Sequence, residues 1–336
     1  MNKLTKKDIC IITPTYNRPE DIELTIKSLI KYKNIPGKHI ILDQSKNKKT
    51  KKVFEKYKRR CPALQYNHYN KAGMSLVLND GIKEALKENY KIICIQADDV
   101  EVRKDVLSIA LKEFNSDEKI KGIGSIQLEQ LEDNSIRRKL KSKIFKFFLL
   151  PSISNTFEIT GPYGNNSITT TEEDSRDCQW LPGFLTFYKS EVFKDYRIPE
   201  RTGYDVLEDI DLGYYSYTKY GKGSLIIPKD MRVYHHMSKV ERYPNKKRIF
   251  VNHEDHMTFY YRYFYNIKGT IKLFWEIFWI NILNIGRTLL KPNKENFLKL
   301  IYLWQALSYC IKYRKKIKAG KSRMFLNQNL SFNENW

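Results

Sequence analysis

Short apolar runs alternate with amphipathic segments over the first hundred residues of the chain. Runs rich in β-branched residues predict buried strands at 8–13, 39–42, around Leu64 and at 91–96. The segments between these runs predict helices at 19–33, 50–60 and 75–88. Strands that alternate with helices in this way are typical of an α/β domain with a largely parallel sheet.

Between residues 100 and 240 the alternation becomes weaker. Strand signals lie near 120–128, 178–189 and 224–227, and a helix is predicted from about Asp209 to Tyr220. The stretch GPYGNNSITTTEED, which precedes the second of these strands, predicts a mobile loop because it is rich in glycine, asparagine and threonine.

Long helical patterns replace the strands after about residue 245. We therefore predict a boundary there, with an α/β domain at 1–245 and a helical region at 246–336. The α/β domain is expected to divide into two halves, 1–100 and 101–245.

Polar residues follow three of the predicted strands at the point where each strand ends. These clusters are Thr13 to Arg18, Asp43 to Ser45, and Asp98 with Asp99. In open sheets of parallel strands, ligands bind where the carboxyl ends of the strands meet loops. We therefore expect the three clusters to share one rim of the sheet and to form a ligand site.

The most informative cluster is the pair of adjacent carboxylates in KIICIQADDVEV at 91–102. Asp98 and Asp99, with Glu101 close by, end a buried strand, and paired carboxylates repel each other unless a positive charge lies between them. A hard divalent cation that carries substrate phosphates would supply that charge. The alternative is an aspartate that caps the helix expected to start near Arg103.

The composition indicates a folded protein with an uneven positive charge. Apolar residues make up 41% of the chain and aromatic residues 13%, which is typical of a folded protein rather than a disordered one. The net charge is +22, and Glu241–Trp336 alone carries 18 Lys and Arg against 6 Asp and Glu. Such a surplus suits nucleic acid or an anionic membrane face, although an AT-rich genome also enriches lysine and asparagine.

The cysteines and the N-terminal residues bear on the compartment. The five cysteines are odd in number and widely spaced, without a CxxC or Cys/His spacing, so neither a disulfide framework nor a zinc site is expected. The N-terminal MNKLTKKDICIITP leads directly into a strand, without the apolar core of a signal peptide. We therefore expect a cytoplasmic protein.

Two predicted helices near the C-terminus suggest contact with a membrane. In TIKLFWEIFWINILNIGRTLL at 270–290, Glu276 and Arg287 argue against a membrane-spanning helix. A helix in the membrane interface fits its basic and tryptophan residues, and the alternative is a helix buried on the α/β domain or in a dimer. A second apolar helix at 297–318 has a polybasic end, which favours anionic lipid. With the basic and aromatic stretch 137–151, this predicts peripheral binding at the inner face of the cell membrane.

Six fragments, taken in order, resemble the inverting GT-A glycosyltransferases of glycosyltransferase family 2 over about residues 8–240. They are IITPTYNRPEDIELTIKSL, IILDQS, KAGMSLVLNDGIKEA, QADDVEV, WLPGF and EDIDLGYY. The resemblance implies a GT-A fold, which is an α/β, Rossmann-like mixed sheet flanked by helices, here with an α-helical C-terminal extension. It also implies that the first half of the α/β domain binds the nucleotide sugar and the second half the acceptor.

The resemblance places several residues at the sugar donor. They are Thr13, Pro14, Tyr16, Arg18, Asp43, Asn79 and Asp98. Arg18 could meet a phosphate in a bidentate way, and Asp43 could accept a hydrogen bond from a uracil or thymine N–H of a UDP- or dTDP-sugar. Asn79 and the nearby Gly81 weaken a helix, which indicates a close approach to a ligand or to a neighbouring strand. The alternatives are a proline-bracketed turn for TYNR, a helix cap for Asp43, and packing for Asn79 and Gly81.

The metal position departs from the commonest family pattern, in which an acid stands two residues before the metal aspartate. Gln96 and Ala97 occupy the earlier positions, so Asp98 and Asp99 both stay candidates for binding Mn²⁺ or Mg²⁺. In some members the second acid binds the metal and the first lies nearer the ribose or diphosphate. His235 in VYHHMS matches the position of a further metal ligand better than the histidine after it. Two further candidates for a diphosphate contact are Lys239 and Arg242.

Glycosyl transfer also needs a base, and LEDIDL supplies three acids at a predicted helix start. A positioned carboxylate can take the proton of the acceptor hydroxyl when proton loss accompanies bond formation. The resemblance implies Asp209 as the base, Glu208 as its neighbour or an acceptor contact, and Asp211 as a structural partner; alternatively, the acids complement the helix dipole. It also implies acceptor contacts at Trp180 and Gly183, where the tryptophan would stack on a sugar ring or else belong to the core.

These assignments predict an enzyme that moves a sugar from a nucleotide-diphosphate sugar to a hydroxyl of a glycan or lipid-linked acceptor. The expected role is in cell-surface polysaccharide or glycoconjugate synthesis. The alternative, a basic nucleic-acid-binding protein, predicts strongly salt-dependent binding, but the chain shows no helix-turn-helix, zinc or RNP signature, so no nucleic-acid partner is expected. A nucleotidyltransferase would need a glycine-rich basic loop after the first strand, which TPTYNRP lacks.

Overall fold

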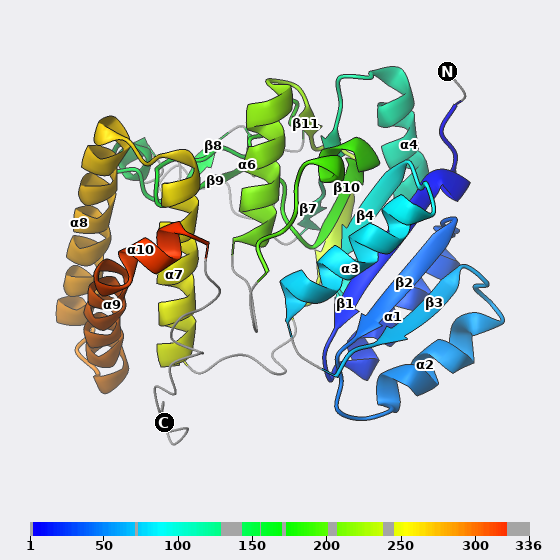
Figure 1. Cartoon of the computed structure of the whole chain (residues 1–336), viewed down its shortest axis with the longest axis horizontal. Helices are drawn as coiled ribbons and strands as arrows, with labels where there is room; N and C mark the ends of the chain where they lie inside the picture. The colour runs from blue at the N-terminus through cyan, green and yellow to red at the C-terminus, as the bar shows by residue number, and fades with distance from the viewer. Residues whose placement is uncertain are drawn as a thin grey trace.

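The computed structural model describes residues 3–70, 73–128, 143–154, 156–169, 173–200, 207–237 and 245–320. At its centre lies a seven-stranded sheet with the strand order β11-β6-β10-β4-β1-β2-β3 (Figure 1). Its strands are β1 (Ile9–Thr15), β2 (Lys38–Asp43), β3 (Leu64–His68), β4 (Ile92–Gln96), β6 (Gly122–Ile123), β10 (Leu185–Lys189) and β11 (Leu225–Ile226). Strand β10 is antiparallel to both β4 and β6, whereas the other pairs are parallel, so the sheet is mixed.

Helices cover both faces of this sheet because successive strand residues point to opposite sides. They are α1 (Pro19–Lys31), α2 (Lys49–Lys58), α3 (Met74–Lys87), α4 (Val106–Ser116) and α6 (Glu208–Tyr220). In β1, Ile12 packs into a cluster with α3 and α6, whereas Ile11 packs into a cluster with α1 and α4. Helix α2 packs with α1 beside Ile41 of β2. The alternation predicted for the first hundred residues is confirmed.

Helix α3 approaches the sheet closely at the Asn-Asp-Gly step that the sequence marked as costly for a helix. A Cβ on Gly81 would lie 2.9 Å from Cγ2 of Ile12 and 3.1 Å from Cδ1 of Leu42. The side chain of Asn79 donates to the carbonyl of Ile198 at 2.8 Å and accepts from its N–H at 3.1 Å. Both residues are therefore used in packing, which was the alternative that the sequence left open.

A second sheet forms directly after the aspartate pair. It contains β5 (Val100–Val102), β12 (Arg232–His235) and β7 (Ile126–Gln127), in the order β5-β12-β7. Because β5 follows Asp99 at once, helix α4 begins only at Val106, and Asp105 caps it by accepting from the N–H of Ser108. The alternative that Asp98 or Asp99 caps this helix is therefore wrong.

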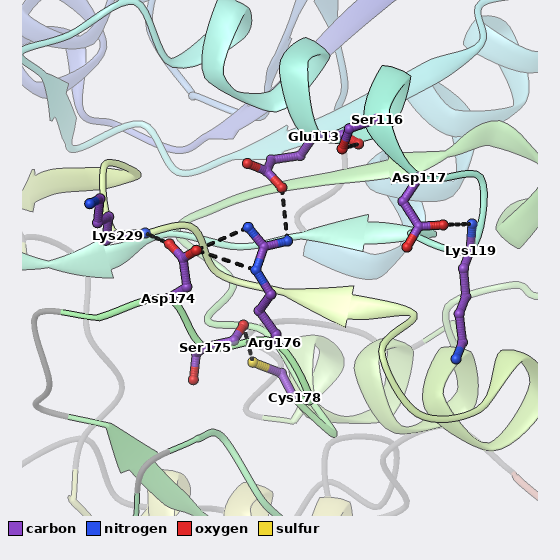
Figure 2. A network of polar contacts seen from close by, with 9 residues as sticks. All are labelled: Glu113, Ser116, Asp117, Lys119, Asp174, Ser175, Arg176, Cys178 and Lys229. Carbon is purple, nitrogen blue, oxygen red and sulfur yellow. Dashed lines mark hydrogen bonds and ion pairs between the residues drawn. The ribbon is translucent and has the colours of Figure 1, made fainter.

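The segment predicted as a loop at 161–174 contains a short strand. Strand β9 (Ser167–Thr169) pairs in parallel with β8 (Ser152–Ser154). After it, Arg176 forms ion pairs with Asp174 and with Glu113 of α4, and Asp174 accepts from the backbone N–H of Lys229 (Figure 2). These contacts tie the segment to α4 and to the turn before β12. The described residues also contain the 3₁₀ helices η1 (Lys6–Asp8) and η3 (Ser190–Lys194).

The C-terminal region is helical, as predicted. It contains α7 (Asn245–Tyr263), α8 (Ile267–Leu290), α9 (Lys294–Lys312) and α10 (Arg314–Lys318). Helix α7 stands between α6 and the pair α8–α9 (Figure 1). Its Arg262 forms an ion pair with Asp211 of α6, and the hydroxyl of Tyr263 donates to the Asp211 carbonyl at 3.2 Å. In the described parts of the chain, no helix has the length and apolar character needed to cross a membrane.

Candidate active site

The three polar clusters meet at one rim of the central sheet, as the sequence predicts. The hydroxyl of Thr15 donates to Oδ2 of Asp98 at 2.7 Å, and Nη1 of Arg18 lies 3.2 Å from Oδ1 of the same carboxylate. The backbone N–H of Asn17 donates to Oγ of Ser45 at 2.8 Å. Asn17 has a φ of 54°, a left-handed conformation that asparagine tolerates better than most residues. This turn brings Arg18 back over the end of β4.

Asp98 is almost completely buried and holds the turn after β1 in place. Its backbone carbonyl accepts from the hydroxyl of Thr25 on α1 at 2.7 Å, which fixes the peptide as well as the side chain. The pKa of Asp98 is raised to about 6, mainly because the carboxyl group is buried. Arg18 and the hydrogen bond from Thr15 lower this pKa, and the nearby charge of Asp99 raises it to a smaller extent. Both oxygens of this carboxylate are thus engaged by the protein.

Asp99 points to a different partner. Its Oδ1 lies 3.1 Å from Nε2 of His235 at the end of β12, and the ring of Phe184 packs on that histidine with a centroid distance of 5.0 Å. The next histidine, His236, instead contacts Glu101 through its ring at 3.3 Å. The two aspartates therefore lie in unlike surroundings, and His235 rather than His236 faces Asp99.

The pair formed by Asp99 and His235 fits a divalent cation that takes only part of its ligands from the protein. Within the described ranges, no group of three His, Cys, Asp or Glu side chains is arranged to hold a metal ion. Mg²⁺ is commonly bound through one or two carboxylates together with substrate phosphates, and a neutral imidazole is a common metal ligand. The arrangement fits a cation that completes its coordination with a bound diphosphate, rather than a metal enclosed by protein.

Asp209 lies at the start of α6, where backbone groups hold its carboxylate. The N–H of Gly183 donates to Oδ2 at 2.9 Å, and the N–H of Ile210 donates to Oδ1 at 2.8 Å. Burial raises the pKa of Asp209 to about 6, although these backbone hydrogen bonds lower it. A carboxylate with a pKa this close to neutrality can exchange a proton during a reaction at physiological pH.

The loop that contains Gly183 connects Asp209 to the aspartate pair. Its next residue, Phe184, accepts a hydrogen bond from the N–H of Ala97 at 2.9 Å, and its ring packs on His235. One short loop therefore contacts Asp209 on one side and both Ala97 and His235 on the other. This loop is the structural link between the candidate base and the candidate metal position.

Trp180 packs in the hydrophobic core of the α/β domain. It is buried, and its ring packs edge-on against Phe157 at 5.1 Å. Gly213 of α6 approaches so closely that a Cβ there would lie 2.6 Å from Cα of Trp180. The tryptophan thus belongs to the core, which was one of the two alternatives, while Gly183 from the same loop contacts Asp209.

The remaining residues predicted at the donor lie around β1 and β2. Asp43 is fully buried and accepts from the N–H of Ser45 at 2.9 Å and from the hydroxyl of Tyr66 at 2.7 Å. The hydroxyl of Thr13 hydrogen-bonds with Nε2 of His39 at 2.9 Å in the interior of the sheet. Pro14, near the end of β1, and Tyr16, in the turn after it, are partly exposed. Asn79 is held by Ile198.

Beside Asp209, a small hollow lies between α6 and α7. Glu208 lines it together with Asp211, and α7 contributes Asp255 and Phe259. Sequence reasoning missed Asp255 because α7 lies outside the resemblance. It also missed Thr25, although a threonine among Ile22, Ile26 and Leu29 on the buried side of α1 was a usable signal. Lys239 and Arg242 lie outside the described residues.

Residues 10–173 match the family model described as "Glycosyl transferase family 2". No curated protein gives a significant match to the chain. These findings give no support to the alternative of a nucleic-acid-binding protein. They agree with the resemblance seen in the sequence fragments.

Solved structures with similar folds include TarS from S. aureus. Residues 1–349 of that protein align with 15% identity and a TM-score of 0.52, covering 93% of this chain and 87% of that chain. The same TarS fragment in complex with UDP-GlcNAc gives 14% identity and a TM-score of 0.51, with coverages of 93% and 88%. The mannosyltransferase PcManGT from Pyrobaculum calidifontis, in complex with GDP-Man and Mn²⁺, aligns at 15% identity with a TM-score of 0.49, covering 91% and 75%.

Proposed function

We propose that this chain, which has the GT-A fold, is a family 2 glycosyltransferase that transfers a sugar with inversion from a nucleotide-diphosphate sugar to a hydroxyl group. The observation that carries the proposal is the loop around Gly183. It contacts Asp209 with one residue, and with the next it contacts Ala97 and His235. A base and a diphosphate site on two sides of one loop are what a single displacement at a sugar carbon requires.

In the proposed reaction, Asp209 takes the proton of the acceptor hydroxyl. The acceptor oxygen forms a new bond to the anomeric carbon as the bond from that carbon to the diphosphate breaks, and the diphosphate leaves with the electron pair. Attack from the face opposite the leaving group inverts the anomeric configuration. The raised pKa of Asp209, about 6, lets it accept a proton while most of it is still ionised at neutral pH.

On the donor side, Asp99 and His235 would hold Mn²⁺ or Mg²⁺, which when bound neutralises charge on the departing diphosphate. Asp98 anchors Arg18, and we assign the guanidinium of Arg18 to a phosphate group of the donor. Each carboxylate oxygen of Asp43 accepts one hydrogen bond from the protein. Each oxygen has a further lone pair that can accept from the N–H of a uracil or thymine base. A UDP- or dTDP-sugar is therefore the proposed donor class.

On the acceptor side, Glu208 precedes the base in the chain and Gly183 donates to it, and we assign both residues to contacts with the acceptor. We assign the acceptor to glycans or lipid-linked glycans in cell-surface polysaccharide or glycoconjugate synthesis, and the enzyme to the cytoplasmic side of the membrane. The division of labour between residues 1–100 and 101–245 belongs to the same proposal.

The test is a donor panel with and without Mn²⁺, in which the release of nucleoside diphosphate is measured. We expect release from a UDP- or dTDP-sugar and a strong dependence on the metal. The Asp209→Asn variant should lose transfer by about a hundredfold or more while it still binds the donor. The product of the wild-type reaction should have the inverted anomeric configuration by NMR.

Asp230→Asn provides a matched control, because Asp230 is an exposed carboxylate whose ion pair with Lys104 lies on the surface. This variant should keep wild-type activity. An Asp209→Asn enzyme with an unchanged rate would remove Asp209 as the base, and release without any metal effect from every donor would contradict the proposed diphosphate site.

A further inference from the structure

Helix α8 carries its apolar residues on the outside. Six large apolar side chains, exposed by between 40% and 75%, follow one another at helical spacing along the outer side of the helix. They are Ile271, Phe274, Trp275, Phe278, Ile282 and Leu289. A soluble surface helix normally turns such a stripe to the core and its charges to water. In α8 this arrangement is reversed.

The inner side of α8, which packs against the rest of the protein, carries a buried acidic residue. Glu276 is completely buried there, and its Oε2 accepts from the backbone N–H of Tyr163 at 2.9 Å. Leu273 lies on the same side and packs into the cluster that contains Val251 of α7 and Ala306 of α9. The buried carboxyl group therefore holds the helix in this orientation, and rotation to hide the apolar stripe would break that contact.

Helix α9 repeats the pattern beside it. Phe297, Ile301, Trp304 and Ile311 are exposed and lie along one stripe, while Ala306 packs inward toward α7. Helices α8 and α9 lie together at the end of the molecule opposite α2 and β3 (Figure 1). We call the ten exposed residues of these two stripes the outer apolar face. Exposed apolar surface of this extent marks a site of interaction with a protein or a membrane.

The exposed charges of residues 245–320, which include α8 and α9, are mostly positive. Residues 245–320 carry 15 Lys and Arg and 4 Asp and Glu. Glu254, Asp255 and Glu276 are buried, so Glu295, which pairs with Lys299 at 2.6 Å, is the exposed acid of this range. Lys268 and Lys272 are exposed on α8 itself, and Lys291 and Lys294 are exposed where α8 meets α9.

We propose that the outer apolar face binds the surface of an anionic phospholipid membrane, with α8 and α9 lying at the boundary between headgroups and acyl chains. Exposed tryptophan and phenylalanine flanked by lysine is the composition of helices that lie in this boundary. Lysines near the surface add attraction to anionic headgroups. The helices lie on the membrane and do not cross it.

The charge pattern favours this partner over a second copy of the chain. Two outer apolar faces brought together would oppose lysines with lysines, and like charges across an interface are costly. The inference deepens the lipid-linked acceptor of the proposed function by naming a membrane partner for the enzyme. Vesicle binding is measured without donor or acceptor, so its failure and the failure of the transfer reaction are separate results.

The experiment measures sedimentation of the full chain with vesicles of phosphatidylcholine, alone or mixed with phosphatidylglycerol. We expect binding to the anionic vesicles and much weaker binding to the neutral ones. The double variant Ile271→Glu and Phe278→Glu should bind the anionic vesicles at least about tenfold more weakly, because it lacks two apolar side chains that the membrane would bury. Both side chains are exposed, so the variant should keep its circular dichroism spectrum and its donor binding.

A matched control changes the net charge equally at another place. Lys51→Gln with Lys52→Gln also lowers the charge by two, on the exposed side of α2, and should leave vesicle binding within about twofold of wild type. Equal loss in both variants would show that net charge alone drives binding and would overturn the proposal. A second result would also overturn the proposal: the wild-type chain does not bind vesicles and is a dimer in sedimentation, while the Ile271→Glu and Phe278→Glu variant is a monomer.

Discussion

The N–H of Gly183 donates to Oδ2 of Asp209 at 2.9 Å, and the two residues come so close that a side chain at position 183 has no room. A Cβ on Gly183 would lie 2.8 Å from Cβ of Asp209. The carboxylate of the proposed base is therefore held by a hydrogen bond that only a glycine at this position permits.

We predict that Gly183→Ala lowers the turnover rate by about tenfold to a hundredfold, because a small displacement of a reacting group has an effect of this size. Donor binding should change little, since the donor lies on the other side of the loop. Steady-state kinetics with saturating donor and acceptor would measure the effect. Gly286→Ala is the control: nothing lies within 4 Å of its added Cβ, and it should keep the rate and gain up to about 1 kcal/mol of stability.

The pH dependence of the rate should report the ionisation of Asp209. A base must be ionised, and its pKa is raised to about 6, so turnover should fall as the pH drops through about 6. The measurement is the turnover rate between pH 5 and pH 8 at saturating substrates. Glu208→Gln should keep this acid limb. If the fall in turnover at low pH disappeared in that variant, Glu208 rather than Asp209 would be the base.

The order of strands and helices was predictable because it depends on local apolar spacing, which the sequence displays directly. The convergence of Thr15, Arg18 and Asp98 on one rim was predictable for a related reason, since the carboxyl ends of parallel strands meet at one edge. What the pattern could not supply is the environment of a side chain that depends on distant segments.

The two aspartates illustrate this limit. Asp98 is engaged by residues of the first turn, whereas Asp99 meets His235, which follows it by more than a hundred positions. Two neighbouring aspartates therefore have different surroundings, because these surroundings depend on segments that are distant in the sequence. Trp180 is a second case, because its burial depends on Phe157 and on the close approach of α6, neither of which has a local signal.

The different surroundings of the two aspartates lead to a prediction about metal binding. Asp99→Asn and His235→Asn should each weaken the binding of Mn²⁺ to the complex with nucleoside diphosphate by at least about tenfold. Isothermal titration of Mn²⁺ into that complex would measure the affinity. His236→Asn is the matched control, because its ring contacts Glu101 instead, and its affinity should be that of the wild type. An equal loss in His236→Asn would contradict the assignment of His235.

Glu276 should make the stability of the fold depend on pH. It is completely buried, and burial raises its pKa to about 8 against the hydrogen bond from the N–H of Tyr163, which lowers it. The folded chain therefore binds the proton more tightly than the unfolded chain, in which the pKa is near 4.5. This contribution to stability is fully present below about pH 4.5 and is lost as the pH rises through about 8.

We predict that Glu276→Gln removes this dependence. Between pH 5 and pH 8, the difference in free energy of unfolding between the wild type and the variant should move against the wild type by about 1.4 kcal/mol for each unit of pH. Urea unfolding at several pH values would measure it. Glu295→Gln, at an exposed glutamate on α9, is the control and should follow the wild type. A constant difference between wild type and Glu276→Gln would mean that Glu276 has the same pKa in the folded and the unfolded chain, and would contradict this prediction.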